Sequence, residues 1–167
     1  MAGPLIITAE LGSVDFAWLD GERRQYFPAE RNQLAAHLTM FHALPPSLEE
    51  EARRTLKQQT AAPPPRAMVA GLMNLGGGVA YRIASDDLDK IRTAIADHFH
   101  GSLSAQDAGG WRAHVTIQNK VTPGEARALK EELERDFQPR PLAIRGLALH
   151  RYLGGPWEKL GAWAFRL

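Results

Sequence analysis

The sequence predicts one folded unit of strands and helices that is built from two similar halves. The motif His-x-Thr occurs twice, at His37 and Thr39 and again at His114 and Thr116. Each copy lies on a predicted strand and precedes a capped helix, a proline break and a strand that contains Gly-Leu. Corresponding positions are separated by about 75 residues, a spacing typical of an internal duplication in which neither half buries its sheet alone.

Turn residues and hydrophobic periodicity place the elements in order. Ser47 and Glu50 form a capping box at the start of a helix, and Thr122 and Glu125 form another in the second half. The glycines at 76–78 predict a hairpin turn. The predicted strands are residues 4–10, 36–43, 66–75, 79–85, 112–118 and 142–152, and the predicted helices are residues 15–26 and those that begin at Ser47, Ser85 and Thr122.

Side chains alternate between the two faces of a strand, and this assigns the neighbours of each motif. One face of each motif strand should carry the histidine, the threonine and one further residue: His37, Thr39 and Phe41 in the first, and His114, Thr116 and Gln118 in the second. We expect the opposite face of the first strand to carry Leu38, Met40 and His42.

The composition bounds the class of protein. A chain of 167 residues suits one domain, or two lobes that share a core, and its 44% hydrophobic and 23% charged residues are ordinary for globular proteins. No apolar stretch approaches the roughly 20 residues that span a bilayer, and the first residues lack a secretion signal. The chain has no cysteine, which excludes disulfides and thiolate nucleophiles. We therefore expect a cytoplasmic protein that does not bind a membrane.

The formal net charge is only +1, and the lysines and arginines form no run. Tight binding to duplex DNA by counterion release is therefore not expected. A nucleic-acid substrate should be a nucleotide or a strand end.

The two motifs suit phosphoryl transfer. Histidine exchanges a proton near neutral pH, so two histidines can act as an acid and base pair. A threonine two residues further along the strand can hydrogen-bond the same bound oxyanion. If a pseudo-twofold axis relates the halves, one imidazole would deprotonate a nucleophile, the other would protonate the leaving oxygen, and the threonines would hold the phosphate. This chemistry requires no metal and no cofactor.

The stretch from Arg31 to Pro45, together with the stretch from Ala113 to Gln118, resembles the two-histidine phosphoesterase superfamily, and especially its bacterial 2'-5' RNA ligase-like branch. The resemblance implies a bilobal α+β fold, with two antiparallel sheets facing a central cleft and helices packed outside. The lobes would correspond to residues 1–75 and 76–167 of a single domain, with strand exchange between them, and we expect a monomer.

The implied activity is hydrolysis of a 2',3'-cyclic phosphate at the end of a nucleotide or RNA, giving a 2'-phosphate. By analogy with the family, His114 would activate water and His37 would protonate the departing 3'-oxygen. Two alternatives stay open: an enzyme that cleaves or reversibly ligates 2'-5' esters, and a module of the same fold that binds nucleotides or RNA ends without turnover.

Other residues have two interpretations each. Arg151 and Tyr152 end a strand beside the loop at 154–157, where they could bind phosphate and base or form an ordinary hairpin end. Phe41 and Gln118 could touch a nucleobase or simply line the pocket. Arg23, near the first motif, could belong to a basic rim but is more often a solvated charge on a helix.

The remaining histidines and Trp111 are expected to be structural. Trp111 stands at a strand start, where a ring usually packs. His98 and His100 point apart on a helix and complete no metal site. We expect structural roles for His42 and His150 also.

Overall fold

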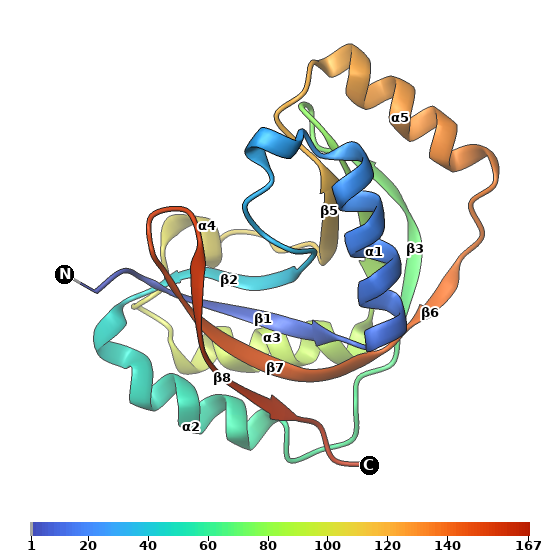
Figure 1. The fold of residues 1–167 in the computed structure, drawn as a ribbon. Helices are drawn as coiled ribbons and strands as arrows, with labels where there is room; N and C mark the ends of the chain where they lie inside the picture. Colours follow the sequence, from blue (N-terminus) through green and yellow to red (C-terminus); the bar gives the residue numbers. More distant parts are fainter. Residues whose placement is uncertain (1) are drawn as a thin grey trace.

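Two four-stranded antiparallel sheets form the framework of the protein in the computed structural model, which describes residues 2–167 (Figure 1). The first sheet has the order β2-β1-β7-β8, with β2 (Leu38–Leu44), β1 (Leu5–Leu11), β7 (Ile144–Tyr152) and β8 (Trp157–Ala164). The second sheet has the order β5-β4-β3-β6, with β5 (His114–Gln118), β4 (Val79–Ala84), β3 (Ala67–Asn74) and β6 (Arg140–Leu142).

Each half of the chain gives one strand to the other half's sheet. Strand β3, from the first half, pairs with β4, and β7, from the second half, pairs with β1. The three-strand orders β2-β1-β7 and β5-β4-β3 are therefore equivalent. The α+β class with two antiparallel sheets is confirmed, while β6 and β8 were not foreseen.

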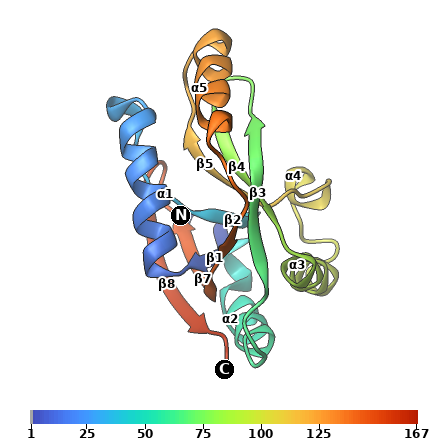
Figure 2. The same cartoon turned by 90° about the vertical axis from the view of Figure 1, so that its right-hand side faces the viewer.

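Helices cover the sheets on their outer sides (Figure 2). Helices α1 and α5 pack against the second sheet, α2 packs against β7 and β8, and α3 contacts β3. The bounds are α1 (Ser13–Tyr26), α2 (Glu49–Gln59), α3 (Asp86–His98), α4 (Ala105–Ala108) and α5 (Pro123–Arg135), with short 3-10 helices at Ala29–Arg31 and Pro46–Leu48. None of these helices is long and apolar enough to cross a membrane, as far as residues 2–167 are concerned.

Two of the three predicted helix caps are present. The Ser85 hydroxyl accepts a hydrogen bond from the Leu88 amide, and Thr122 forms the predicted capping box with Glu125. The capping box predicted at Ser47 is wrong. The preceding prolines start a 3-10 turn in which the Leu48 amide bonds the Pro45 carbonyl, so Ser47 lies inside that turn and α2 begins later.

The core is a continuous cluster of buried apolar side chains that reaches from the first sheet to the second. Alternate residues of β1, among them Leu5 and Ile7, are fully buried on one face of the first sheet. The opposite face carries Thr8 and Glu10, and this is the face that carries the polar site described below.

Candidate active site

The two motif histidines are held in the same way. The Nδ1 atom of His37 bonds the Ala35 carbonyl at 2.8 Å, and Nδ1 of His114 bonds the Arg112 carbonyl at 2.9 Å. A carbonyl oxygen only accepts, so Nδ1 of each ring carries the hydrogen. The Nε2 atom of each imidazole is therefore the atom available for proton exchange.

The strands that carry the motifs lie next to each other. Strands β2 and β5 are in contact, although they belong to different sheets. The backbone carbonyl of each motif threonine also accepts a hydrogen bond from a side chain in the other half of the chain. Trp111 Nε1 donates to the Thr39 carbonyl at 3.1 Å, and Arg23 Nη1 donates to the Thr116 carbonyl at 3.0 Å. The fold thus brings both His-x-Thr strands to one place between the lobes.

Arg23 is buried, which differs from the solvated role that is usual for such a charge. Besides Thr116, it donates from Nε to Asn32 at 2.9 Å, and its guanidinium lies 4.4 Å from the Phe27 ring centre. Trp111 packs as predicted, because its ring is partly buried against the core.

The expectation that Phe41 shares the face of Thr39 is wrong. Thr39 is paired with Thr8 of β1, whereas Phe41 is paired with Ile7. Thr8 and Ile7 are consecutive and point to opposite faces, so Thr39 and Phe41 do as well. The cause is a β-bulge at Met40, which inserts one residue and reverses the alternation. Phe41 is fully buried in the core.

The same error recurs at Gln118 in the second half. Thr116 is paired with Ala80 of β4, whereas Gln118 is paired with Val79, so a bulge at Ile117 turns Gln118 to the other face. Gln118 is 7% exposed, and its Oε1 has no hydrogen-bond partner among the described residues. Neither Phe41 nor Gln118 lines the site, and the bulge follows the motif threonine in both halves.

Arg151 and Tyr152 separate in the structure. Arg151 ion-pairs with Glu49 of α2 at 2.5 Å, on the side of the first sheet away from the motif histidine, so its expected contact with a phosphate is wrong. Tyr152 is exposed and is paired with Trp157 of β8. It therefore remains a candidate for contact with a base at the edge of the site.

A cavity of about 410 Å³ beside His37 contains residues that sequence reasoning missed. The Trp157 ring lies 4.6 Å from the His37 ring and 5.3 Å from the His150 ring. His150 shares a hydrogen bond of 2.9 Å with the Thr8 hydroxyl, and Lys159 also lines the cavity. Successive side chains of a strand point to opposite faces, so the sequence could have placed His150 on the face of β7 opposite to Arg151.

Arg82 is a further residue that sequence reasoning missed. It lies directly across from His114 on β4, and its side chain is exposed. Cross-strand partners lie on the same face of a sheet, so Arg82 brings a positive charge to the side of His114.

The pKa of His37 is lowered to about 4, mainly by burial. The nearby Arg23, His150 and His114 contribute to the lowering, while the Ala35 carbonyl opposes it, so His114 is close enough to His37 to act on its charge. Burial also lowers the pKa of His150, with Lys159 adding to the effect. In the free protein His37 is therefore neutral near pH 7, with an unprotonated Nε2.

Residues 2–167 contain no group of three or more His, Asp or Glu side chains arranged to hold a metal ion. His98, which was considered for such a role, bonds Glu51 of α2 through Nε2 at 2.8 Å.

Two antiparallel sheets that bring together two His-x-Thr strands define the two-histidine phosphoesterases of the LigT-like branch, and the predicted resemblance is confirmed. The family model described as the 2'-5' RNA ligase superfamily matches residues 13–156, and the chain belongs to that superfamily of phosphoester chemistry.

Solved structures support the fold. TT0787 of Thermus thermophilus is 14% identical, with a TM-score of 0.68 over 98% of both chains. LigT of E. coli is 13% identical in its complex with 3'-AMP, with a TM-score of 0.62 over 100% of both chains, and 16% identical in its complex with NADP+, with a TM-score of 0.61 over 99% of both. No curated protein sequence matches the chain.

Proposed function

We propose that the protein is a metal-independent phosphodiesterase that hydrolyses the 2',3'-cyclic phosphate end of a nucleotide or RNA. The observation that carries the proposal is the equivalent setting of His37 and His114. Each imidazole donates a hydrogen bond from Nδ1 to the carbonyl two residues before it. His37 immediately precedes β2, His114 is the first residue of β5, and these two strands contact each other. The reacting phosphate would lie between the two Nε2 atoms.

The reaction needs one base and one acid. A water molecule attacks phosphorus and gives a proton to the base, the bond from phosphorus to O3' breaks, and the acid gives a proton to O3'. The product carries a 2'-phosphate. The hydroxyls of Thr39 and Thr116 would hold the nonbridging oxygens, and Arg82 would offset their charge.

The resemblance to the family implies that His114 is the base and His37 the acid. The lowered pKa of His37 favours the opposite order, because its imidazole is unprotonated near pH 7 and a general base must start the reaction unprotonated. We therefore propose His37 as the base and His114 as the acid.

The nucleoside would occupy the cavity beside His37. Aromatic and apolar side chains line it, including Phe16, Leu34 and Trp157, and its volume of about 410 Å³ falls in the usual range for small-molecule sites. LigT of E. coli has been solved with 3'-AMP, ATP and NADP+, which agrees with a nucleotide ligand for this fold.

The test is hydrolysis of adenosine 2',3'-cyclic phosphate in the presence of EDTA. His37→Ala and His114→Ala should each lower kcat by at least about 100-fold, the range for loss of general acid or base catalysis. The exposed His100→Ala is the matched control. Product analysis should find the 2'-phosphate.

Other outcomes identify the alternatives. Turnover that survives both substitutions rules out the proposed mechanism, and loss of turnover on chelation indicates a metal. A 2'-5' dinucleotide that is cleaved faster than the cyclic phosphate would favour the 2'-5' phosphodiesterase, and binding without any turnover would favour the nucleotide-binding module.

A further inference from the structure

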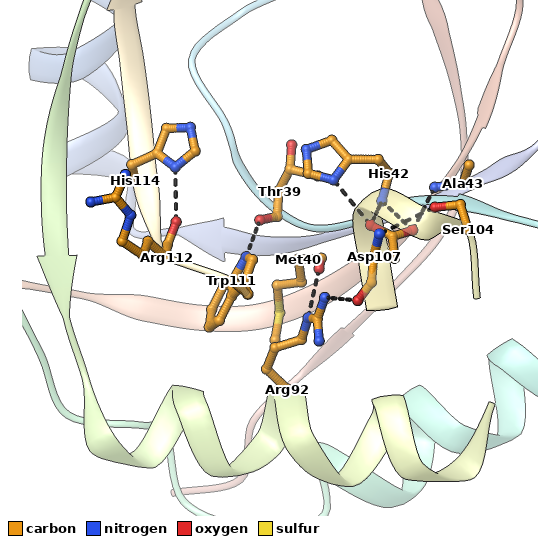
Figure 3. A network of polar contacts seen from close by, with 10 residues as sticks. All are labelled: Thr39, Met40, His42, Ala43, Arg92, Ser104, Asp107, Trp111, Arg112 and His114. Carbon is orange, nitrogen blue, oxygen red and sulfur yellow. Dashed lines mark hydrogen bonds and ion pairs between the residues drawn. The ribbon is translucent and has the colours of Figure 1, made fainter. Parts of the chain in front are cut away.

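A second cavity, of about 300 Å³, lies beside His114. Its ionisable lining residues are His42, Arg92, Asp107, Arg112 and His114 (Figure 3). We propose that this cavity binds a second phosphate group of the substrate, the 5'-phosphate of the nucleotide whose cyclic phosphate is hydrolysed. The proposal deepens the proposed function and rests on it for the position of the reacting phosphate.

The bulge that hides Phe41 turns His42 toward this cavity. Phe41 points into the core, so the next side chain along β2 points to the face of Thr39. His42 is accordingly half-exposed and lines the cavity together with His114. The sequence assigned the opposite faces to Phe41 and His42, and the structure exchanges them.

Asp107 of α4 fixes the orientation of His42. Its carboxylate is completely buried and accepts hydrogen bonds from His42 Nδ1 at 3.1 Å and from the His42 and Ala43 amides at 2.8 and 2.9 Å. These bonds outweigh the effect of burial and lower the pKa of Asp107, so the carboxylate is ionised.

The free nitrogen of His42, Nε2, therefore lies on the side of the ring away from Asp107, the side of Thr39 in Figure 3. When Nε2 donates to an anion, the Asp107 charge stabilises the positive imidazole from behind.

Arg92 holds the wall of the cavity in place. It is buried, donates from Nε to the Met40 carbonyl at 2.9 Å and from Nη2 to the Asp107 carbonyl at 2.7 Å, and lies 4.0 Å from the Phe41 ring centre. These contacts tie α3 both to the bulge and to α4. The positive charge of Arg92 is thereby fixed at the back of the cavity.

The charge of the lining favours an anion. Two arginines, two histidines and one carboxylate line this cavity. The carboxylate, that of Asp107, already accepts hydrogen bonds from the backbone of β2. Arg112 adds an exposed guanidinium at the mouth, while its carbonyl holds His114. A phosphate suits such a site, because several charge-assisted hydrogen bonds can form to its oxygens at once.

The two cavities beside the motif histidines carry similar charges, because Arg145 and Lys159 accompany Glu10 in the first, and Arg92 and Arg112 accompany Asp107 in the second. They differ in the rest of the lining. The cavity beside His37 has the apolar surfaces of Phe16, Leu34 and Trp157, which suit a base, and its Lys159 bonds Glu10. In the cavity beside His114 the half-exposed His42 and the exposed Arg112 can contact a phosphate.

In a nucleotide that has both a 2',3'-cyclic phosphate and a 5'-phosphate, the ribose carries the base on C1', the cyclic phosphate on C2' and C3', and the second phosphate on C5'. The cyclic phosphate thus lies between the base and the 5'-phosphate, as the proposed reaction site lies between the two cavities. The 5'-phosphate can be free or can link to the preceding nucleotide of an RNA.

The test compares product-type ligands by titration calorimetry, in the absence of turnover. Adenosine 2',5'-bisphosphate should bind wild-type protein about ten-fold or more tightly than adenosine 2'-phosphate, as expected for charge-assisted hydrogen bonds. His42→Gln should lower affinity for the bisphosphate about ten-fold and affect the monophosphate much less. The exposed His100→Gln is the matched control.

Arg112→Gln is the second variant, and it is suitable because the side chain is exposed and the substitution keeps the carbonyl that holds His114. It should reproduce the selective loss, even if His42→Gln does not fold. A dinucleotide that ends in a 2'-phosphate tells an internal phosphate from a free one, because tight binding of it shows that the site accepts a linked 5'-phosphate.

Equal affinities of wild type for the two adenosine ligands, an equal loss for both ligands in the variants, or no binding at all would overturn the proposal. These outcomes are separate from the fate of the proposed function. A protein that binds the bisphosphate selectively but hydrolyses no cyclic phosphate keeps the second phosphate site and loses the phosphodiesterase. A protein that hydrolyses cyclic phosphates but binds both ligands alike does the reverse.

Discussion

Acidification should destabilise the protein through His37. Its imidazole is neutral in the folded state because burial lowers its pKa to about 4, while in the unfolded chain it would have the ordinary value of about 6.5. Between these two values the unfolded state binds more protons than the folded state. Stability therefore rises with pH through this window, and it falls as the solution is acidified.

The size of the effect follows from the two pKa values. Integrating the linkage relation from about pH 7 to about pH 5 gives a loss of about 2 kcal/mol in the free energy of unfolding from this one residue. The loss would be nearly absent above about pH 7, where His37 is neutral in both states.

The assay is urea unfolding of wild type and His37→Gln at the two pH values. Glutamine does not ionise, so the variant should lose about 2 kcal/mol less than wild type on acidification. Groups that do not interact with His37 contribute to both proteins alike and cancel in the difference. If the two proteins lose the same stability, the burial argument for His37 is refuted.

Three further changes have definite expected results. On a diester with a nitrophenol leaving group, which departs without a proton, His114→Ala should retain at least about ten-fold more activity than His37→Ala, and the reverse ranking would exchange the two roles. Trp157→Ala should raise KM for a cyclic nucleotide about ten-fold by removing a stacking surface, and an unchanged KM would place the base elsewhere. Thr122→Ala should lower the free energy of unfolding by about 1 kcal/mol in urea titrations, through loss of the α5 cap, and no change would mean the cap is unimportant.

Much of the fold could be predicted because its signals are local. The capping box at Thr122 and the glycines at 76–78 set the limits of elements by backbone chemistry alone, and the strands between them are present. Strands β6 and β8 were missed. The former has only three residues, and the latter follows directly from the hairpin at 154–157 with little period-2 alternation.

The errors at the site share a cause. Phe41, Gln118 and His42 were assigned to faces by strict alternation, which one inserted residue reverses. Nothing in the sequence marks Met40 or Ile117 as such an insertion, since both are ordinary strand residues. The extra residue at Met40 is stabilised by distant partners, notably Arg92 at its carbonyl, which only the folded chain brings near.

Arg151 was misplaced for a different reason. Its partner Glu49 lies about 100 positions earlier in the chain, so the ion pair on the outer side of the sheet follows from tertiary packing. The catalytic roles of the two histidines and the two threonines stay predictions.

The exchange of β3 and β7 makes the halves of the chain mutually dependent. A chain ending near residue 75 would keep β1 and β2 but lack β7, and the open edge of β1 would be exposed to any other strand. When the two halves are expressed together as separate fragments, β3 of the first should pair with β4 of the second, and β7 of the second with β1 of the first. The fold should then be recovered as a complex of the two fragments. In the intact chain the same exchange links the two halves, because each sheet contains a strand from the other half of the chain.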